Sequence, residues 1–186
     1  MTSRTSGTEA PTITFTAVLE VVGGTTLVRL PHEASAQLPS RGQVAVRGVL
    51  SGHEVGTVLE PDGRSGHWMR VDDAVCGVAG VAPGDTVEVS VELAEDWPEP
   101  EVPVDLSDAL DAAPEKIQST WQDITPMARW EWVRWVGATK NPETRQRRVE
   151  VSIDKLDHGK RRPCCFDLSS CTDPAVSRSG KLVEAS

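Results

Sequence analysis

The spacing of apolar residues changes near position 100, and this change constrains the fold more than any other feature of the sequence. Before it, segments such as TITFTAVLEVV and TVEVSVEL alternate apolar and polar residues, as half-buried strands do. After it, residues 105–159 carry apolar residues three and four positions apart, as on one face of a helix. The sequence therefore predicts an α+β protein in which a β domain precedes a helical one.

Turn signals divide the first region into about six short strands. The signals are Gly23-Gly24, Ser51-Gly52, Pro61-Asp62-Gly63 and Pro83-Gly84-Asp85. Short strands at this spacing favour a closed barrel over an open sheet, because closure removes exposed strand edges. We expect a small split β-barrel over residues 12–98, preceded by a disordered tail at residues 1–11.

The stretch AEDWPEPEVPV is acidic and rich in proline, which favours an extended spacer, and we place a linker at residues 99–104. Three or four short helices should follow over residues 105–159. Thr125-Pro126 and Asn141-Pro142 both have the sequence of a helix start, with a capping side chain before a proline. Residues 160–186 are expected to form an irregular tail that bears cysteines.

Charge and hydropathy exclude several classes of protein. Residues 1–103 hold 6 basic and 15 acidic residues, which argues against nucleic acid as a partner and against a transcription regulator that uses the barrel. No apolar run approaches the roughly 20 residues that span a bilayer. The first ten residues lack the apolar core of a secretory signal, so we expect a cytoplasmic protein without a membrane span.

The tail GKRRPCCFDLSSC suggests a metal or thiol site. Cys164, Cys165 and Cys171, with His158 or Cys76 as a fourth ligand, could bind zinc, copper or iron. Adjacent cysteines are an awkward chelating pair, because neighbouring side chains point apart in an extended chain. The basic residues beside them could instead favour a reactive, redox-active thiolate. A third interpretation is that the cysteines have no special role, and the sequence leaves all three open.

Tryptophan and arginine side chains suggest a ligand site. Four tryptophans lie at helical spacing, and although packing explains most of them, one or two could line a groove for an apolar ligand. Arginines could clamp a carboxylate or phosphate, or could simply form a solvated helix face. We expect a ligand at a cleft between barrel and helices, bound by these residues: Trp68, Trp130, Trp135, Arg145 and Arg148.

Two segments resemble a known bacterial family. The helical signature is carried by Ala138, Lys140, Pro142, Glu143, Thr144, Arg145, Arg147 and Arg148. It is similar to that of the bacteriocin-protection, YdeI/OmpD-associated family. The barrel cues resemble the domain of unknown function that often precedes it; they are Phe15-Thr16-Ala17, Arg47-Gly48, Ser51-Gly52, Gly66-His67-Trp68, Pro83-Gly84-Asp85, Pro103, Asp105-Leu106 and Ala109-Leu110. The resemblance implies a split barrel with a helical appendage, linked to tolerance of antimicrobial peptides, and no agreed catalytic residues.

The sequence contains no nucleophile elbow, P-loop or dinucleotide fingerprint. Together with the resemblance, this favours a binding or stress-tolerance protein over an enzyme, with a small molecule or peptide as partner. The alternative function is metal binding or thiol chemistry in the cysteine-bearing tail. The oligomeric state stays open.

Overall fold

The computed structural model describes residues 11–163 and 172–185. The chain divides into two compact units. The first consists of the chain up to Glu20, Thr26–Pro61 and Ser65–Asp96. The second consists of Val21–Thr25, Asp62–Arg64 and the chain from Trp97 onward.

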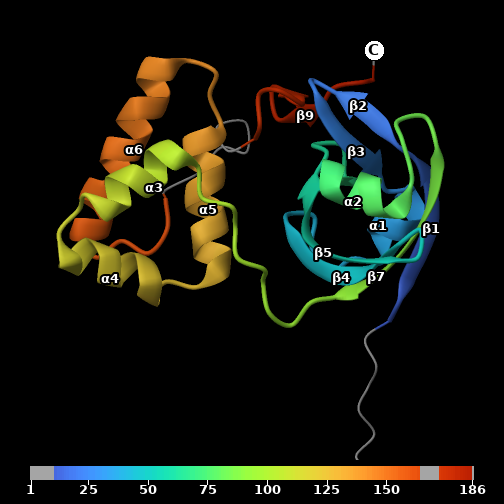
Figure 1. The fold of residues 1–186 in the computed structure, drawn as a ribbon, viewed down its shortest axis with the longest axis horizontal. Helices are drawn as coiled ribbons and strands as arrows, with labels where there is room; N and C mark the ends of the chain where they lie inside the picture. The colour runs from blue at the N-terminus through green and yellow to red at the C-terminus, as the bar shows by residue number, and fades with distance from the viewer. Residues whose placement is uncertain (1–10, 164–171, 186) are drawn as a thin grey trace, which may run out of the picture. The chain divides into compact units, whose positions relative to one another are not determined.

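Seven antiparallel strands form a curled half-barrel (Figure 1). The strands are β1 (Ile13–Val18), β2 (Glu20–Val22), β3 (Thr25–Arg29), β4 (Val44–Leu50), β5 (His53–Pro61), β6 (His67–Arg70) and β7 (Thr86–Leu93). Their order in the sheet is β1-β7-β4-β5-β6-β3-β2, so the sheet ends at β1 and β2. The α+β prediction is confirmed. The segment that was predicted as the first strand forms two strands, β1 and β2. Between them, the backbone of Leu19 forms hydrogen bonds with the turn at Gly84 and Asp85.

The predicted alternation sets the register of the sheet. Ile13 pairs with Val91 and Phe15 with Val89, and all four side chains are buried in one apolar core. The intervening residues, such as Thr14 and Thr16, are exposed. Because side chains on a strand alternate between two faces, one residue of slip would move this whole set out of the core.

Two short helices in this region are absent from the strand-based prediction. They are α1 (His32–Ala36) and α2 (Asp73–Ala79). The second ends at Gly80, which adopts a left-handed conformation with φ of 66° and donates its N–H to the carbonyl of Cys76. This stop signal is present in the sequence, but a seven-residue helix shows too few periods for its spacing to stand out.

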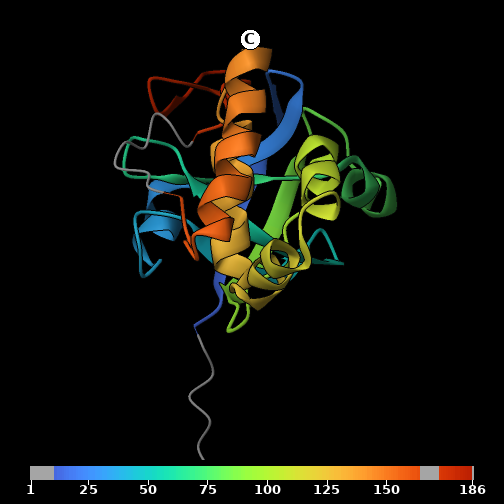
Figure 2. The same cartoon turned by 90° about the vertical axis from the view of Figure 1, so that its left-hand side faces the viewer.

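Four helices follow, as predicted: α3 (Val104–Asp111), α4 (Glu115–Asp123), α5 (Pro126–Gly137) and α6 (Pro142–Asp157). Both predicted starts are confirmed. Thr125 Oγ1 accepts from the N–H of Ala128, and Asn141 Oδ1 accepts from the N–H of Thr144. In Figures 1 and 2, α6 runs alongside α5, and α3 and α4 also contact it.

A second apolar core lies among these helices, and the fully buried Trp132 belongs to it. Within the part of the chain that the structure describes, none of the helices has the length and apolar character that a membrane crossing requires.

The tail was predicted to be irregular, and its described part, residues 172–185, contains one short hairpin. There, β8 (Ser177–Arg178) and β9 (Lys181–Leu182) form a hairpin. Ser179 and Gly180 have φ angles of 50° and 75°, as a two-residue type I′ hairpin turn requires.

Candidate functional site

In the helical unit, side chains from elsewhere in the unit bind the backbone carbonyls at the C-terminal ends of α3, α4, α5 and α6. The last carbonyls of a helix have no partner within it and carry the negative end of its dipole, so cations and amide donors are favoured there. Gln118 Nε2 donates to the carbonyl of Ala113, just after α3, at 2.9 Å. Lys116 Nζ donates to the carbonyl of Asp157, at the end of α6, at 2.6 Å.

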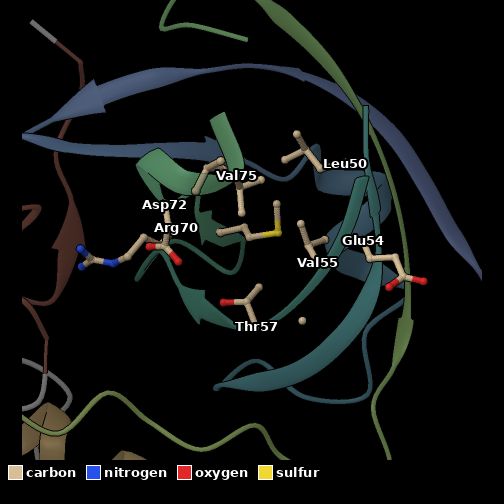
Figure 3. Close-up of a pocket in the computed structure, with 10 residues that line it drawn as sticks. Leu50, Glu54, Val55, Thr57, Arg70, Asp72 and Val75 are labelled. Carbon is tan, nitrogen blue, oxygen red and sulfur yellow. The ribbon is translucent and has the colours of Figure 1, made fainter. Parts of the chain in front are cut away.

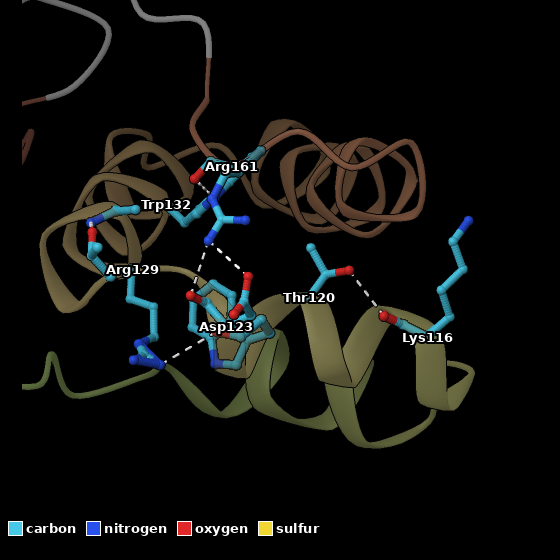
Figure 4. A network of polar contacts seen from close by, with 9 residues as sticks. Lys116, Thr120, Asp123, Arg129, Trp132 and Arg161 are labelled. Carbon is cyan, nitrogen blue, oxygen red and sulfur yellow. Dashed lines mark hydrogen bonds and ion pairs between the residues drawn. The ribbon is translucent and has the colours of Figure 1, made fainter.

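The end of α4 is bound by an arginine that follows α6 (Figure 4). Arg161 donates to the carbonyl of Asp123 at 3.0 Å and to its carboxylate at 2.8 Å. The carbonyl of Arg161 in turn accepts from Nε1 of the buried Trp132 at 3.2 Å. This chain of bonds ties three segments of the unit together, and it leaves Trp132 with its polar atom satisfied.

Arg145, one of the predicted ligand-binding residues, is bound inside the protein. Its guanidinium forms two hydrogen bonds with the Asp105 carboxylate, at 2.6 and 2.9 Å. This bidentate pair holds the pKa of Asp105 below its ordinary value, chiefly through the hydrogen bond, although partial burial opposes the shift. A ligand carboxylate at Arg145 would therefore have to displace Asp105, a partner that is already in the favoured geometry.

Two of the predicted tryptophans also have internal roles. Trp130 donates from Nε1 to the carbonyl of Pro98 at 2.6 Å. Trp68 lies on β6 and is only 4% exposed. Trp68 belongs to the first unit, whereas the other predicted ligand-binding residues belong to the second. The prediction of a cleft between barrel and helices stays a prediction.

The structure brings Trp135 and Arg148 together. Arg148 donates to the carbonyl of Trp135, near the end of α5, at 2.6 Å, and its guanidinium carbon lies 5.3 Å from the centroid of the indole ring. Burial lowers the pKa of Arg148, although an arginine still remains cationic at neutral pH. Trp132 meets Trp135 edge to face, with the ring centroids 6.2 Å apart. These contacts fix the half-buried indole of Trp135 at the margin of the second core.

Lys155 is a third member of this site that the sequence analysis missed. Its Nζ atom lies 5.5 Å from the centroid of the Trp135 ring. Lys155 follows Arg148 by seven residues on α6, which is two helical turns, so both side chains lie on one face. That spacing is the signal that could have revealed it. We refer to Trp135, Arg148 and Lys155 as the Trp135 site.

A carboxyl on α5 lies one turn before Trp135. Burial raises the pKa of the Glu131 carboxyl, whereas the positive charges of Arg162 and Arg134 act in the opposite direction. Arg162 lies 3.4 Å from this carboxyl. Positions four residues apart share a helix face, so Glu131 and Trp135 lie on the same side of α5.

The first unit contains a separate cavity of about 120 Å³ beside β5 and the start of α2 (Figure 3). It is lined by Leu50, Glu54, Val55, Gly56, Thr57, Met69, Arg70, Val71, Asp72 and Val75. In the close-up, Leu50, Val55 and Val75 converge on it, whereas Glu54 and Arg70 extend away. An engineered apolar cavity of about 150 Å³ holds one benzene ring, so this cavity could take one side chain but not a peptide.

Three of the four proposed metal ligands lie outside the described residues: Cys164, Cys165 and Cys171. His158 is described, and it is exposed at the end of α6 with Nδ1 2.8 Å from the carbonyl of Asp154. Among the described residues, no group of three or more histidine, cysteine or acidic side chains could hold a metal ion. Burial, aided by the charge of Asp73, raises the pKa of Cys76, which disfavours its thiolate.

These features define an α+β protein with a half-barrel unit and a helical unit that contains a tryptophan flanked by two cations. Comparison with known families assigns it further. Residues 99–159 match the family described as bacteriocin-protection, YdeI or OmpD-associated. Residues 15–91 match a domain of unknown function, DUF1905. Both resemblances seen in the sequence are thereby confirmed. A search of the curated proteins finds no match.

Proposed function

We propose that this chain is a non-catalytic binding protein that protects cells against bacteriocins by binding peptides at the Trp135 site. The observation that carries the proposal is the pair of cations over Trp135, in the region that matches the bacteriocin-protection family. An indole offers a large, rigid apolar surface, and cations beside it favour an anionic group on the ligand.

The chemistry of the site suggests which part of a peptide it would bind. Arg148 and Lys155 would pair with a terminal carboxylate, while the side chain of the last residue would pack on Trp135. Arg148 is held by its bond to the carbonyl of Trp135, so its guanidinium needs little further ordering when a ligand arrives.

Other basic residues of the helical unit are less suited to this role. Arg145 is paired with Asp105, and Arg161 with Asp123. A ligand that used either arginine would have to break an existing ion pair. Arg148 and Lys155 lie beside the ring of Trp135, so a ligand there could meet cations and an apolar surface together.

Tryptophan fluorescence tests the binding step. The probes are N-acetyl-Phe-Ala-Leu with a free carboxylate and the same peptide as a C-terminal amide. The free acid should quench or shift the emission with a saturable dependence on concentration, and the amide should bind at least about tenfold more weakly because it lacks the charge. Equal responses to the two peptides would contradict carboxylate recognition.

Two variants identify the site. Lys155→Met removes the ammonium group but keeps the apolar stem, so it should weaken binding of the free acid without unfolding the helix. Lys140→Met removes an exposed lysine from the same unit and should leave binding unchanged. Equal loss in both variants would show that general charge, rather than the Trp135 site, attracts the peptide.

The protective role needs a test in cells. Bacteria that express the chain should survive a bacteriocin challenge better than bacteria that express the Lys155→Met variant at the same level. Protection by the variant equal to that of the unchanged chain would separate the tolerance function from the Trp135 site.

A further inference from the structure

The backbone of the C-terminal segment, residues 172–185, closely approaches two turns that contain glycine. A Cβ atom added to Gly23 would overlap the carbonyl oxygen of Ala175, and one added to Gly63 would overlap the carbonyl oxygen of Gly180. Both glycines have positive φ angles, of 55° and 74°. Each position therefore favours glycine for two reasons: the turn requires a positive φ angle, and the neighbouring backbone leaves no room for a Cβ atom.

Other turn glycines have only the first of these requirements. Gly24 and Gly84 also have positive φ angles, of 81° and 96°, but no described atom lies within 4 Å of a Cβ added to either. The contact with the hairpin is thus a property of two particular turns and does not follow from turn geometry in general. The hairpin presents small residues there, Ala175 and Gly180, so the two surfaces are complementary in shape.

Hydrogen bonds, burial and charge support the same contact. Leu182 donates its N–H to the carbonyl of Asp62 at 2.9 Å, and Arg64 pairs with Glu184 at 2.9 Å. Val176 and Leu182 are at most 1% exposed. The turns Val21–Thr25 and Asp62–Arg64 group with the second unit rather than with the strands beside them.

The hairpin also has hydrogen bonds of its own. Val183 donates to the carbonyl of Val176 at 2.9 Å, and the side chain of Asp173 accepts from the N–H of Ala175 at 2.8 Å. Its strands have only two residues each, and so short a hairpin is marginally stable by itself. Its order therefore depends on the surface against which it packs as much as on its own hydrogen bonds.

We propose that the turns at Gly23 and Gly63 form a recognition surface for a tight β-hairpin, and that residues 172–185 are its built-in occupant. The occupant acts as a detachable clasp. The partner that this surface fits is a hairpin with a two-residue turn and with small residues at the two points of contact.

Hydrogen exchange of the full-length protein tests the closed clasp. Gly23→Ala and Gly63→Ala should speed exchange of the Leu182 amide by roughly ten- to a hundredfold, because overpacking of this kind displaces the neighbouring backbone. Gly24→Ala is the matched control. Its φ angle of 81° lies farther than the 55° of Gly23 from the left-handed conformation that alanine can adopt, so backbone strain alone would make Gly24→Ala the more damaging change. Equal or greater exchange in Gly24→Ala would overturn the proposal.

Limited trypsin digestion provides a second measurement on the same variants. Arg178 and Lys181 are exposed but lie within the docked hairpin, so cleavage after them should require the clasp to open. Cleavage should be faster in Gly23→Ala and Gly63→Ala than in the unchanged protein, and unaltered in Gly24→Ala. Equal cleavage in all four proteins would also overturn the proposal.

Recognition in trans tests whether the surface treats the hairpin as a ligand. Leu182→Asp places a charge at a buried position of the clasp and should release it while both turns stay intact. A fluorescent peptide of residues 172–185 should then bind this full-length variant saturably, and bind the unchanged protein much more weakly because its surface is filled. Absence of binding to Leu182→Asp at roughly 1 mM peptide, near the effective concentration of a tethered segment, would overturn recognition. Equal binding when Gly63→Ala is added to the variant would overturn it too.

Discussion

The two units are stabilised in different ways. In the first, residues such as Phe15 and Val89 meet across a ladder of backbone bonds and pack in a core that is almost entirely aliphatic. In the second, helices are tied together by side chains that reach distant backbone carbonyls, as Lys116 does at Asp157 and Arg148 at Trp135. A sheet satisfies its own carbonyls, whereas a helix leaves its last turn unsatisfied.

This difference explains why basic residues of the helical unit are poor indicators of function. Arg145 looks like an anion-binding residue in the sequence, yet it pairs with Asp105 of the same unit, and Arg161 pairs with Asp123 in the same way. In the arginine-rich signature, Arg145 binds a carboxylate of the same unit and Arg148 binds a backbone carbonyl, so both stabilise the fold. In the Trp135 site, Arg148 and Lys155 lie over the ring of an indole.

Truncation of a fully buried side chain in each core should have the largest effect on stability. Trp132→Ala should lower the free energy of unfolding by about 3–5 kcal/mol, because it leaves a cavity and removes the bond to the Arg161 carbonyl. Leu59→Ala in the first core should lower it by about 2–5 kcal/mol. Hydrogen exchange should show the first effect in α3–α6 and the second in β1–β7. Uniform loss of protection in both variants would show that the two cores unfold as one.

Loss of a helix-capping arginine should have the next largest effect. Arg148→Met leaves the carbonyl of Trp135 without its charged donor and should lower stability by about 1–2 kcal/mol, measured by urea unfolding. Arg147→Met removes an exposed neighbour on the same helix and should change stability by less than about 0.5 kcal/mol. If both changes had the same effect, the capping explanation of the arginine-rich segment would be wrong.

The Arg145–Asp105 pair should contribute less, because both side chains are partly exposed. Arg145→Gln should lower stability by about 1 kcal/mol at neutral pH. The lowered pKa of Asp105 means that the pair stabilises the fold above the unfolded value of about 3.9 and loses this contribution as the pH falls toward the lower, folded value. The difference between variant and unchanged protein should therefore shrink below about pH 4. A difference that stayed constant in acid would contradict this assignment.

The smallest effect is expected for Arg161→Met. Its ion pair with Asp123 is largely exposed, and such pairs contribute roughly 0–1 kcal/mol. The thermal midpoint should fall by only a few degrees and the deficit should diminish in high salt. A deficit as large as that of Arg148→Met would show that the bonds around Trp132 depend on Arg161 more strongly than its exposure suggests.

The parts of the fold that follow from neighbouring residues could be predicted. Alternation placed β1 and β7, and capping dipeptides placed the starts of α5 and α6 at Thr125 and Asn141. The bond from Lys116 to Asp157 could not be predicted, because its partners are 41 residues apart. The C-terminal hairpin was missed because its strands are too short to show a period.

Ligand binding by the candidate site residues stays a prediction, but their proximity can be compared with the structure. Trp135 and Arg148 were chosen for their chemistry, and the structure brings them together. Lys155 was missed, and the internal partners of Arg145 and Trp130 were not foreseen. A sequence shows which side chains could bind a ligand, but only the fold shows which of them are already bound to the protein.

The six indole N–H signals in a two-dimensional NMR spectrum offer the most direct test of the central claim, that peptides bind at Trp135. Titration with N-acetyl-Phe-Ala-Leu carrying a free carboxylate should shift the Trp135 signal, with a smaller change at Trp132, which touches it. The signals of Trp68 and Trp130 should stay in place, because one ring is buried in β6 and the other donates to Pro98. Shifts confined to Trp68 or Trp130, or a Trp135 signal that does not move at saturating peptide, would contradict the account.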